Sequence, residues 1–274
     1  MLGKLIKHDF IGSAHSMAIV YLIALVSFAV TALSYVFNIS FLKVIGSLSL
    51  IVVVLGLVLI TTFIMMNYFN KSLYSDQGYL SYTLPVKPKQ LLFSKALVSF
   101  TWLALSYLIM VGTFSAILWY AKAKLGESLG SDFDEMIDMI SSMVSGGGFP
   151  TVKVITKIVA GILIYGFVTV LVMVAEVFFS MTLSNVKGFN KLGFFGGILI
   201  FIVVYIALQV ASALIMVYFP MSLFISGEDI SLTFKSMNEV SNTFGVGGII
   251  FQVIMSAVMF FTTNKLMSKK INLR

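Results

Sequence analysis

Six uninterrupted apolar runs constrain the fold of this chain more than any other feature. Each has at least the roughly 20 residues that an α-helix needs to cross the hydrocarbon core of a bilayer. Glu176 is the only formally charged residue within them. Lipid offers no hydrogen-bond partner to a peptide group, so each run is expected to span as a helix, without the alternating pattern of a β-barrel. The runs cover residues 17–37, 44–66, 97–119, 158–183, 192–219 and 245–264.

The composition excludes a soluble globular protein. Hydrophobic residues make up 59% of the 274 residues and charged residues only 11%, whereas soluble domains have about 25% charged residues. The net charge of +7 is not gathered into a basic patch with stacking aromatic residues, so no nucleic-acid partner is expected. The first run is too long for a signal peptide and is expected to remain as a span. The sequence therefore predicts an all-α polytopic membrane protein, with one transmembrane domain over residues 1–274.

The lysines and the single arginine predict the orientation of the spans. Twelve of these residues fall on the side of the two chain ends and six on the opposite side, which also holds eight acids. Because basic residues near spans are enriched on the cytoplasmic side, both termini are expected to be cytoplasmic. The twelve are Lys4, Lys7, Lys71, Lys87, Lys89, Lys95, Lys187, Lys191, Lys265, Lys269, Lys270 and Arg274.

The connections between the runs lack the residues of an enzyme. The longest, the outer loop 120–157, is too short for a catalytic domain, and the glycines at 146–148 are not followed by the Lys-Ser/Thr pair of a phosphate loop. The chain has no cysteine, and its two histidines, His8 and His15, precede the first run. No catalytic residue and no metal site are therefore expected. Residues 131–144 carry apolar side chains at helical spacing among acids, which predicts an outer amphipathic helix.

The connection 67–96, between the second and third runs, carries the most specific signal. Ser75 and Asp76 are typical of a helix start, and Pro85 of a helix end. A short, partly apolar helix between them predicts a docking surface on the cytoplasmic side, although an interfacial helix packed on its own bundle has the same pattern. Residues Leu2–Ser16 have a similar amphipathic pattern, which predicts an interfacial helix before the first span.

The residues Asp76, Gly78, Tyr79, Leu80, Thr83, Leu84, Pro85 and Val86 resemble the stretch after the second span in type-2 ATP-binding-cassette (ABC) permeases. The six-span layout and the long outer loop are similar to that family as well. The basic residue often found beside the acid is absent, because Ser75 and Gln77 flank Asp76.

The resemblance implies a permease subunit of an exporter in a bacterial cytoplasmic membrane. The segment would be a coupling helix that contacts a separate ATPase subunit, which would bind ATP and magnesium, while this chain would hold no cofactor. A second permease chain, identical or related, would complete the pathway. An amphipathic peptide, drug or lipid-like molecule would suit its apolar bundle. The contact residues would be Tyr74, Asp76, Gln77, Gly78, Tyr79, Leu80, Pro85 and Val86.

A few polar residues inside the runs are candidates for a translocation path. Glu176 is expected to face the bundle, where it either hydrogen bonds Gln209 or a hydroxyl, or binds a proton or a cationic group. Ser27 and Thr31 share one face of the first run, which indicates helix packing or the lining of a path. Two other functions stay open: a proton-coupled secondary transporter that uses Glu176, and a membrane signalling scaffold.

Overall fold

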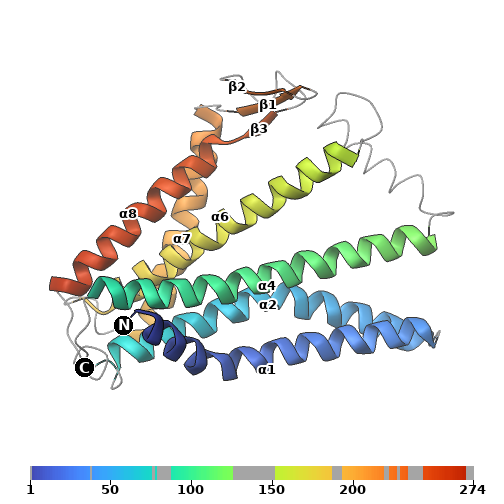
Figure 1. Cartoon of the computed structure of the whole chain (residues 1–274), viewed down its shortest axis with the longest axis horizontal. Helices are drawn as coiled ribbons and strands as arrows, with labels where there is room; N and C mark the ends of the chain where they lie inside the picture. Colours follow the sequence, from blue (N-terminus) through green and yellow to red (C-terminus); the bar gives the residue numbers. More distant parts are fainter. Residues whose placement is uncertain are drawn as a thin grey trace. The chain divides into compact units, whose positions relative to one another are not determined.

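Six helices that are long and apolar enough to cross a membrane make up most of the computed structural model (Figure 1). They confirm the six predicted spans and fit a multi-pass membrane protein. The structure describes residues 2–37, 39–75, 78, 88–125, 152–186, 193–218, 222–226, 229–233 and 243–269. The helices are α1 (Leu2–Val36), α2 (Ser40–Tyr74), α4 (Pro88–Leu125), α6 (Val152–Ser184), α7 (Gly193–Tyr218) and α8 (Gly247–Lys269).

Several helices are longer than the apolar runs that predicted them. The helix α1 has 35 residues, about 52 Å at the usual helical rise, which exceeds a hydrocarbon core of about 30 Å. Residues Leu2–Ser16 are thus the first turns of α1, continuous with the span that follows. Their place at the membrane interface stays a prediction. The helices α2 and α4 likewise continue past their apolar runs, with 35 and 38 residues.

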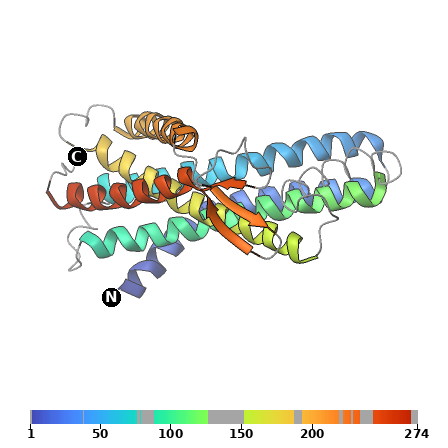
Figure 2. The same cartoon turned by 90° about the horizontal axis from the view of Figure 1, so that it is seen from above.

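The structure adds a small sheet that the sequence pattern did not predict. The strands β1 (Ser222–Ser226), β2 (Asp229–Thr233) and β3 (Thr243–Gly245) form an antiparallel sheet in the order β2-β1-β3. β1 pairs with β2 from Ser222 opposite Thr233 to Ser226 opposite Asp229. The chain passes from β3 directly into α8, with one residue between them, and the strands lie beside one end of this helix (Figure 2). The sheet occupies the connection between the fifth and sixth spans.

The chain divides into two compact units. The first consists of residues 1–114, 173–201 and 259–274, and the second of residues 115–172 and 202–258. In the first unit, α1 and α2 run antiparallel side by side and α4 lies along them (Figure 1). In the second unit, the backbone of α8 at Gly248 approaches α7 so closely that an added Cβ would lie 3.3 Å from the Ser212 carbonyl oxygen. Gly248 therefore permits close packing of α8 against α7.

A core of apolar side chains joins α1, α2 and α4. It is formed by Met17 on α1, Met65 on α2, and Val98 and Trp102 on α4, all of which are buried. Each helix contributes residues at helical spacing, because its inward face recurs every three or four positions. The buried polar residues described next lie on the same three faces.

Candidate functional site

The most polar buried site of the first unit is centred on Asp9 of α1. Asp9, Ser13 and Met17 recur every four residues, and all three are buried, with Asp9 only 3% exposed. They form one inward face of α1. The polar side of Leu2–Ser16 is therefore divided, because Asp9 points into the protein while Lys4, Lys7 and His8 are exposed. The amphipathic pattern did not predict that the acid would turn inward.

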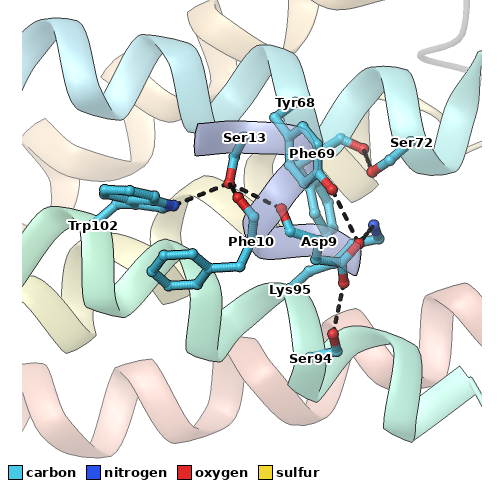
Figure 3. Close-up of polar contacts among 9 residues, drawn as sticks. All are labelled: Asp9, Phe10, Ser13, Tyr68, Phe69, Ser72, Ser94, Lys95 and Trp102. Carbon is cyan, nitrogen blue, oxygen red and sulfur yellow. Dashed lines mark hydrogen bonds and ion pairs between the residues drawn. The ribbon is translucent and has the colours of Figure 1, made fainter. Parts of the chain in front are cut away.

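Three side chains from two other helices donate hydrogen bonds to the Asp9 carboxylate (Figure 3). Lys95 Nζ of α4 and Tyr68 Oη of α2 each lie 3.0 Å from Oδ1. Ser94 Oγ of α4 lies 2.6 Å from Oδ2. Lys95 is also 3% exposed, so both charges of the pair are buried. The Lys95 ammonium lies 5.1 Å from the centre of the Tyr68 ring, which adds a cation–π contact.

A second layer extends this network along α1 and α4. Trp102 Nε1 donates to Ser13 Oγ at 2.9 Å, and Ser13 Oγ in turn donates to the Asp9 carbonyl oxygen at 2.9 Å (Figure 3). The Phe10 ring lies 4.6 Å from the Trp102 ring, centre to centre. We name the set Asp9, Ser13, Tyr68, Ser94, Lys95 and Trp102 the Asp9 cluster. Its members tie α1, α2 and α4 together.

Further hydroxyl groups continue the connection toward the middle of the three helices. Tyr21 Oη of α1 donates to the Trp102 carbonyl oxygen at 3.0 Å and shares a hydrogen bond of 2.9 Å with Ser106 Oγ. Thr61 Oγ1 of α2 shares a hydrogen bond of 2.8 Å with the same Ser106 oxygen. On α4, Lys95, Trp102 and Ser106 follow at intervals of seven and four residues, which keeps them on one face.

A glycine makes room for the Tyr68 ring against α1. A Cβ atom at Gly12 would lie 3.3 Å from Tyr68 Oη and 3.5 Å from its ring. A larger residue there would push Tyr68 away from Asp9. The glycine therefore lets the hydroxyl of α2 reach a carboxylate on α1.

The chemistry of the Asp9 cluster is that of a fixed ion pair. The three donors satisfy both carboxylate oxygens, and all of them come from side chains held on helices. Among the residues that the structure describes, no group of histidine and acid side chains is suited to hold a metal ion. A buried pair of this kind specifies how helices fit together, and removing either partner leaves an uncompensated charge.

A second polar contact joins the ends of α2 and α6 in the same unit. Tyr74 is 4% exposed, and its hydroxyl shares a hydrogen bond of 2.8 Å with Thr182 Oγ1. Asn185 Nδ2 donates to Asn70 Oδ1 at 3.3 Å and to the Met181 carbonyl oxygen at 2.8 Å. The sequence analysis placed Tyr74 on a surface facing a partner. In the structure its side chain packs inside this bundle, so we omit it from the proposed contact surface.

Most of the other predicted partner contacts lie outside the described residues. These are Asp76, Gln77, Tyr79, Leu80, Pro85 and Val86, and the outer amphipathic helix at 131–144 lies outside them as well. Gly78 is described, and its amide donates to the Ser75 carbonyl oxygen at 2.6 Å. This hydrogen bond closes a turn of the chain directly after α2. The coupling helix stays a prediction.

The candidate path residues belong to different units: Ser27, Thr31 and Glu176 to the first and Gln209 to the second. Glu176 of α6 is 2% exposed, and no hydrogen bond or ion pair between described side chains reaches its carboxyl group. Gln209 of α7 belongs to the second unit and is exposed, so its hydrogen bond with Glu176 stays a prediction. Thr31 Oγ1 donates to the Gly46 carbonyl oxygen at 2.9 Å, and Ser27 Oγ lies 3.4 Å from Ser49 Oγ. For Ser27 and Thr31 these contacts favour the packing interpretation over the lining of a path.

The sequence pattern placed Lys95 among the basic residues on the side of the chain ends and gave no sign that it pairs with Asp9. A signal of burial was nonetheless present. Lys95 stands one turn inside an apolar stretch that contains Leu91, Leu92 and Val98, and Asp9 lies in register with Ser13 and Met17. What the sequence alone lacked was the partner, because the two charges are 86 positions apart.

Comparison of the chain with family models, with curated proteins and with solved structures finds no match.

Proposed function

We propose that this chain is the membrane subunit of an ATP-driven exporter of the type-2 ABC class. One observation carries the proposal: the segment 76–86, whose residues resemble a coupling helix, connects two helix ends that the Asp9 cluster ties together. Tyr68 lies near the end of α2 and Lys95 near the start of α4. A docking segment that connects these two helices is therefore joined directly to the bundle of α1, α2 and α4.

The buried ion pair gives this connection its stiffness. A push on segment 76–86 would act on the last turns of α2 and the first turns of α4. Both helices contact the same carboxylate on α1. The three helices would then move together, because changing their register would separate two charges that are out of reach of water. Movement of a partner subunit would thus reach the spans.

In the proposed assembly, two permease chains form the pathway and a separate ATPase subunit binds ATP and magnesium. Asp76, Gln77, Gly78, Tyr79 and Leu80 contact that subunit, and Pro85 and Val86 direct the chain back into the membrane. Both termini lie in the cytoplasm of a bacterial cell. An apolar bundle with few charges suits an amphipathic peptide, a drug or a lipid-like cargo.

The test is purification of the tagged chain from its native membranes in mild detergent, with mass spectrometry and an ATPase assay. We expect a stoichiometric subunit that carries a phosphate loop and hydrolyses ATP. Gly78→Trp and Tyr79→Asp should each lower the recovery of that subunit at least tenfold. Gly3→Trp is the matched control, because a Cβ at Gly3 meets nothing within 4 Å. Purification of the chain alone, after crosslinking and without ATP hydrolysis, would refute the proposal.

A proton-coupled transporter is the second candidate, and one observation favours it. Glu176 is a buried carboxyl group that no described side chain binds, and intramembrane acids often mark proton or ion pathways. Glu176→Gln would then abolish proton-driven uptake or efflux in vesicles, while Gly78→Trp would leave it unchanged. The opposite pattern supports the exporter.

A further inference from the structure

In the first unit, the described acids are buried, whereas most of the described lysines are exposed. Its two described acids, Asp9 and Glu176, are both buried. Five described lysines of this unit, Lys4, Lys7, Lys71, Lys89 and Lys265, are exposed. On α1 this contrast arises because Asp9 points into the protein. The only acid of the segment Leu2–Ser16 is thereby removed from the surface. The exposed part of this segment therefore carries basic groups without a compensating acid.

The basic groups of α1 lie on one face. At 100° per residue, Lys4, Lys7, His8, Ile11 and His15 fall within an arc of about 100°, and Asp9 lies on the opposite side. All five are exposed in the structure. We call them the basic face. Its central residue, Ile11, is apolar and 64% exposed.

The basic face also lies at a depth where lipid headgroups are available. The helix α1 continues without a break into a membrane-spanning segment. The apolar run of this span begins only at Met17, so the basic face precedes the hydrocarbon core. The first turns of α1 run at an angle to the rest of the helix (Figures 1 and 2), which suits a segment that lies along the headgroup layer at one surface. Lysine side chains reach toward headgroups while their apolar stems cover neighbouring hydrocarbon.

We propose that the basic face of α1 binds the phosphate groups of anionic phospholipids. Lysines next to an exposed apolar residue are typical of helices that rest on an anionic membrane surface. An acidic protein partner would match the charges but would give no reason for an exposed isoleucine among them. The proposal does not depend on the exporter function, because lipid binding requires neither the ATPase subunit nor the segment 76–86.

The test is a titration of the detergent-purified chain with phosphatidylglycerol and with phosphatidylcholine, followed by native mass spectrometry. A lysine near an anionic surface contributes about fivefold in affinity, or about 1 kcal/mol. The double variant Lys4→Gln/Lys7→Gln should therefore bind phosphatidylglycerol about 25-fold more weakly, with binding of phosphatidylcholine unchanged. The matched control is Lys122→Gln/Lys124→Gln. It also removes two charges, but near the C-terminal end of α4, whereas the start of α4 contacts α1, and it should retain wild-type binding.

Three results would overturn the proposal. One is equal affinity of the wild-type chain for both lipids. Another is the same loss in both double variants, since the effect would then follow net charge and not the basic face. The third comes from a photo-crosslinking amino acid at position 7 in native membranes: an adduct with a protein instead of a phospholipid would assign the face to an acidic partner. Unchanged unfolding of the Lys4→Gln/Lys7→Gln variant in dodecyl sulfate shows that its fold is intact.

Discussion

At the scale of single residues, the pairing of Asp9 with Lys95 is the most consequential contact in the described chain. Two apolar side chains in these positions would pack without the cost of removing charges from water. The ion pair instead demands one geometry, because Tyr68, Ser94 and Lys95 must all reach the same carboxylate. The pair therefore gives the three helices a defined register more than it gives them stability.

The ion pair predicts an asymmetry between single and double variants. Lys95→Met should lower the free energy of unfolding by about 3–5 kcal/mol, because it leaves the Asp9 carboxylate buried without its cation. The double variant Asp9→Asn/Lys95→Met should recover most of that loss. Unfolding in mixed micelles with increasing dodecyl sulfate measures both values. Losses that simply add in the double variant would show that the two side chains do not interact.

A side chain at Gly197 on α7 should force the buried side chains that face it on α6 to move. A Cβ there would lie 2.5 Å from Met181 Sδ and 3.2 Å from Ser184 Oγ, and both side chains are fully buried. We expect Gly197→Val to cost about 1–3 kcal/mol through overpacking, again measured by unfolding in dodecyl sulfate. Gly56→Ala is the control, since its Cβ meets only Ile60 Cδ1, at 3.7 Å. A Gly197→Val variant as stable as Gly56→Ala would contradict the close approach.

At the scale of elements, α1 and α2 form a hairpin whose contact depends on small and hydroxyl-bearing residues. The Thr31 hydroxyl bonds the Gly46 carbonyl oxygen, and Gly46 has no side chain to hold the helices apart. Such contacts between small residues are typical of helix packing in lipid. For the hydroxyl face of the first span the sequence indicated either helix packing or the lining of a path, and it did not identify the glycine opposite.

The hairpin predicts that a disulfide can form between α1 and α2. A Cβ built on Gly46 lies 3.6 Å from Thr31 Cβ, within the range of about 3.5–4.5 Å found in disulfides. The natural chain has no cysteine, so Thr31→Cys/Gly46→Cys should oxidise to one intramolecular bridge, seen as a mobility shift between reduced and oxidised gels. Thr31→Cys/Gly56→Cys, ten residues further along α2, should not form it. Equal oxidation of both pairs would mean that the hairpin register is wrong.

The helices were predictable from the sequence because lipid leaves the backbone no alternative to internal hydrogen bonds. Their ends were less predictable. An acid or a lysine next to an apolar run normally indicates the membrane surface, yet Asp9 and Lys95 neutralise each other inside the bundle, and α1 and α4 continue past them. The strands β1–β3 were missed because they are short and lie between two strongly apolar runs.

At the scale of the whole molecule, the distribution of basic residues predicts the orientation of the chain. With twelve lysine and arginine residues on the side of the chain ends and six on the other, the positive-inside rule predicts that both ends lie in the cytoplasm. The site could be predicted only in part from the same information. The segment 76–86 has a local pattern, whereas the Asp9 cluster depends on residues distant in sequence, which periodicity within one helix cannot pair.

The orientation is testable with single cysteines in the otherwise cysteine-free chain. Gly3→Cys should resist a membrane-impermeant maleimide added to intact cells and react after the cells are opened. Gly146→Cys, in the loop 120–157, should react in intact cells. A cysteine at Ser75 gives a second cytoplasmic position as a control. Labelling of Gly3→Cys in intact cells would reverse the orientation and remove the basis for a cytoplasmic coupling segment.

The long sequence separation in the Asp9 cluster also sets an order of events during synthesis. Lys95 follows Asp9 by 86 positions, so at about 5–20 residues per second the ribosome makes it about 4–17 s later. Until then α1 and α2 can associate through Thr31 and Gly46, but Asp9 has no cation. The arrival of α4 therefore completes the group, and a chain that stalls before it leaves the Asp9 carboxylate with the Tyr68 hydroxyl of α2 but without its cation.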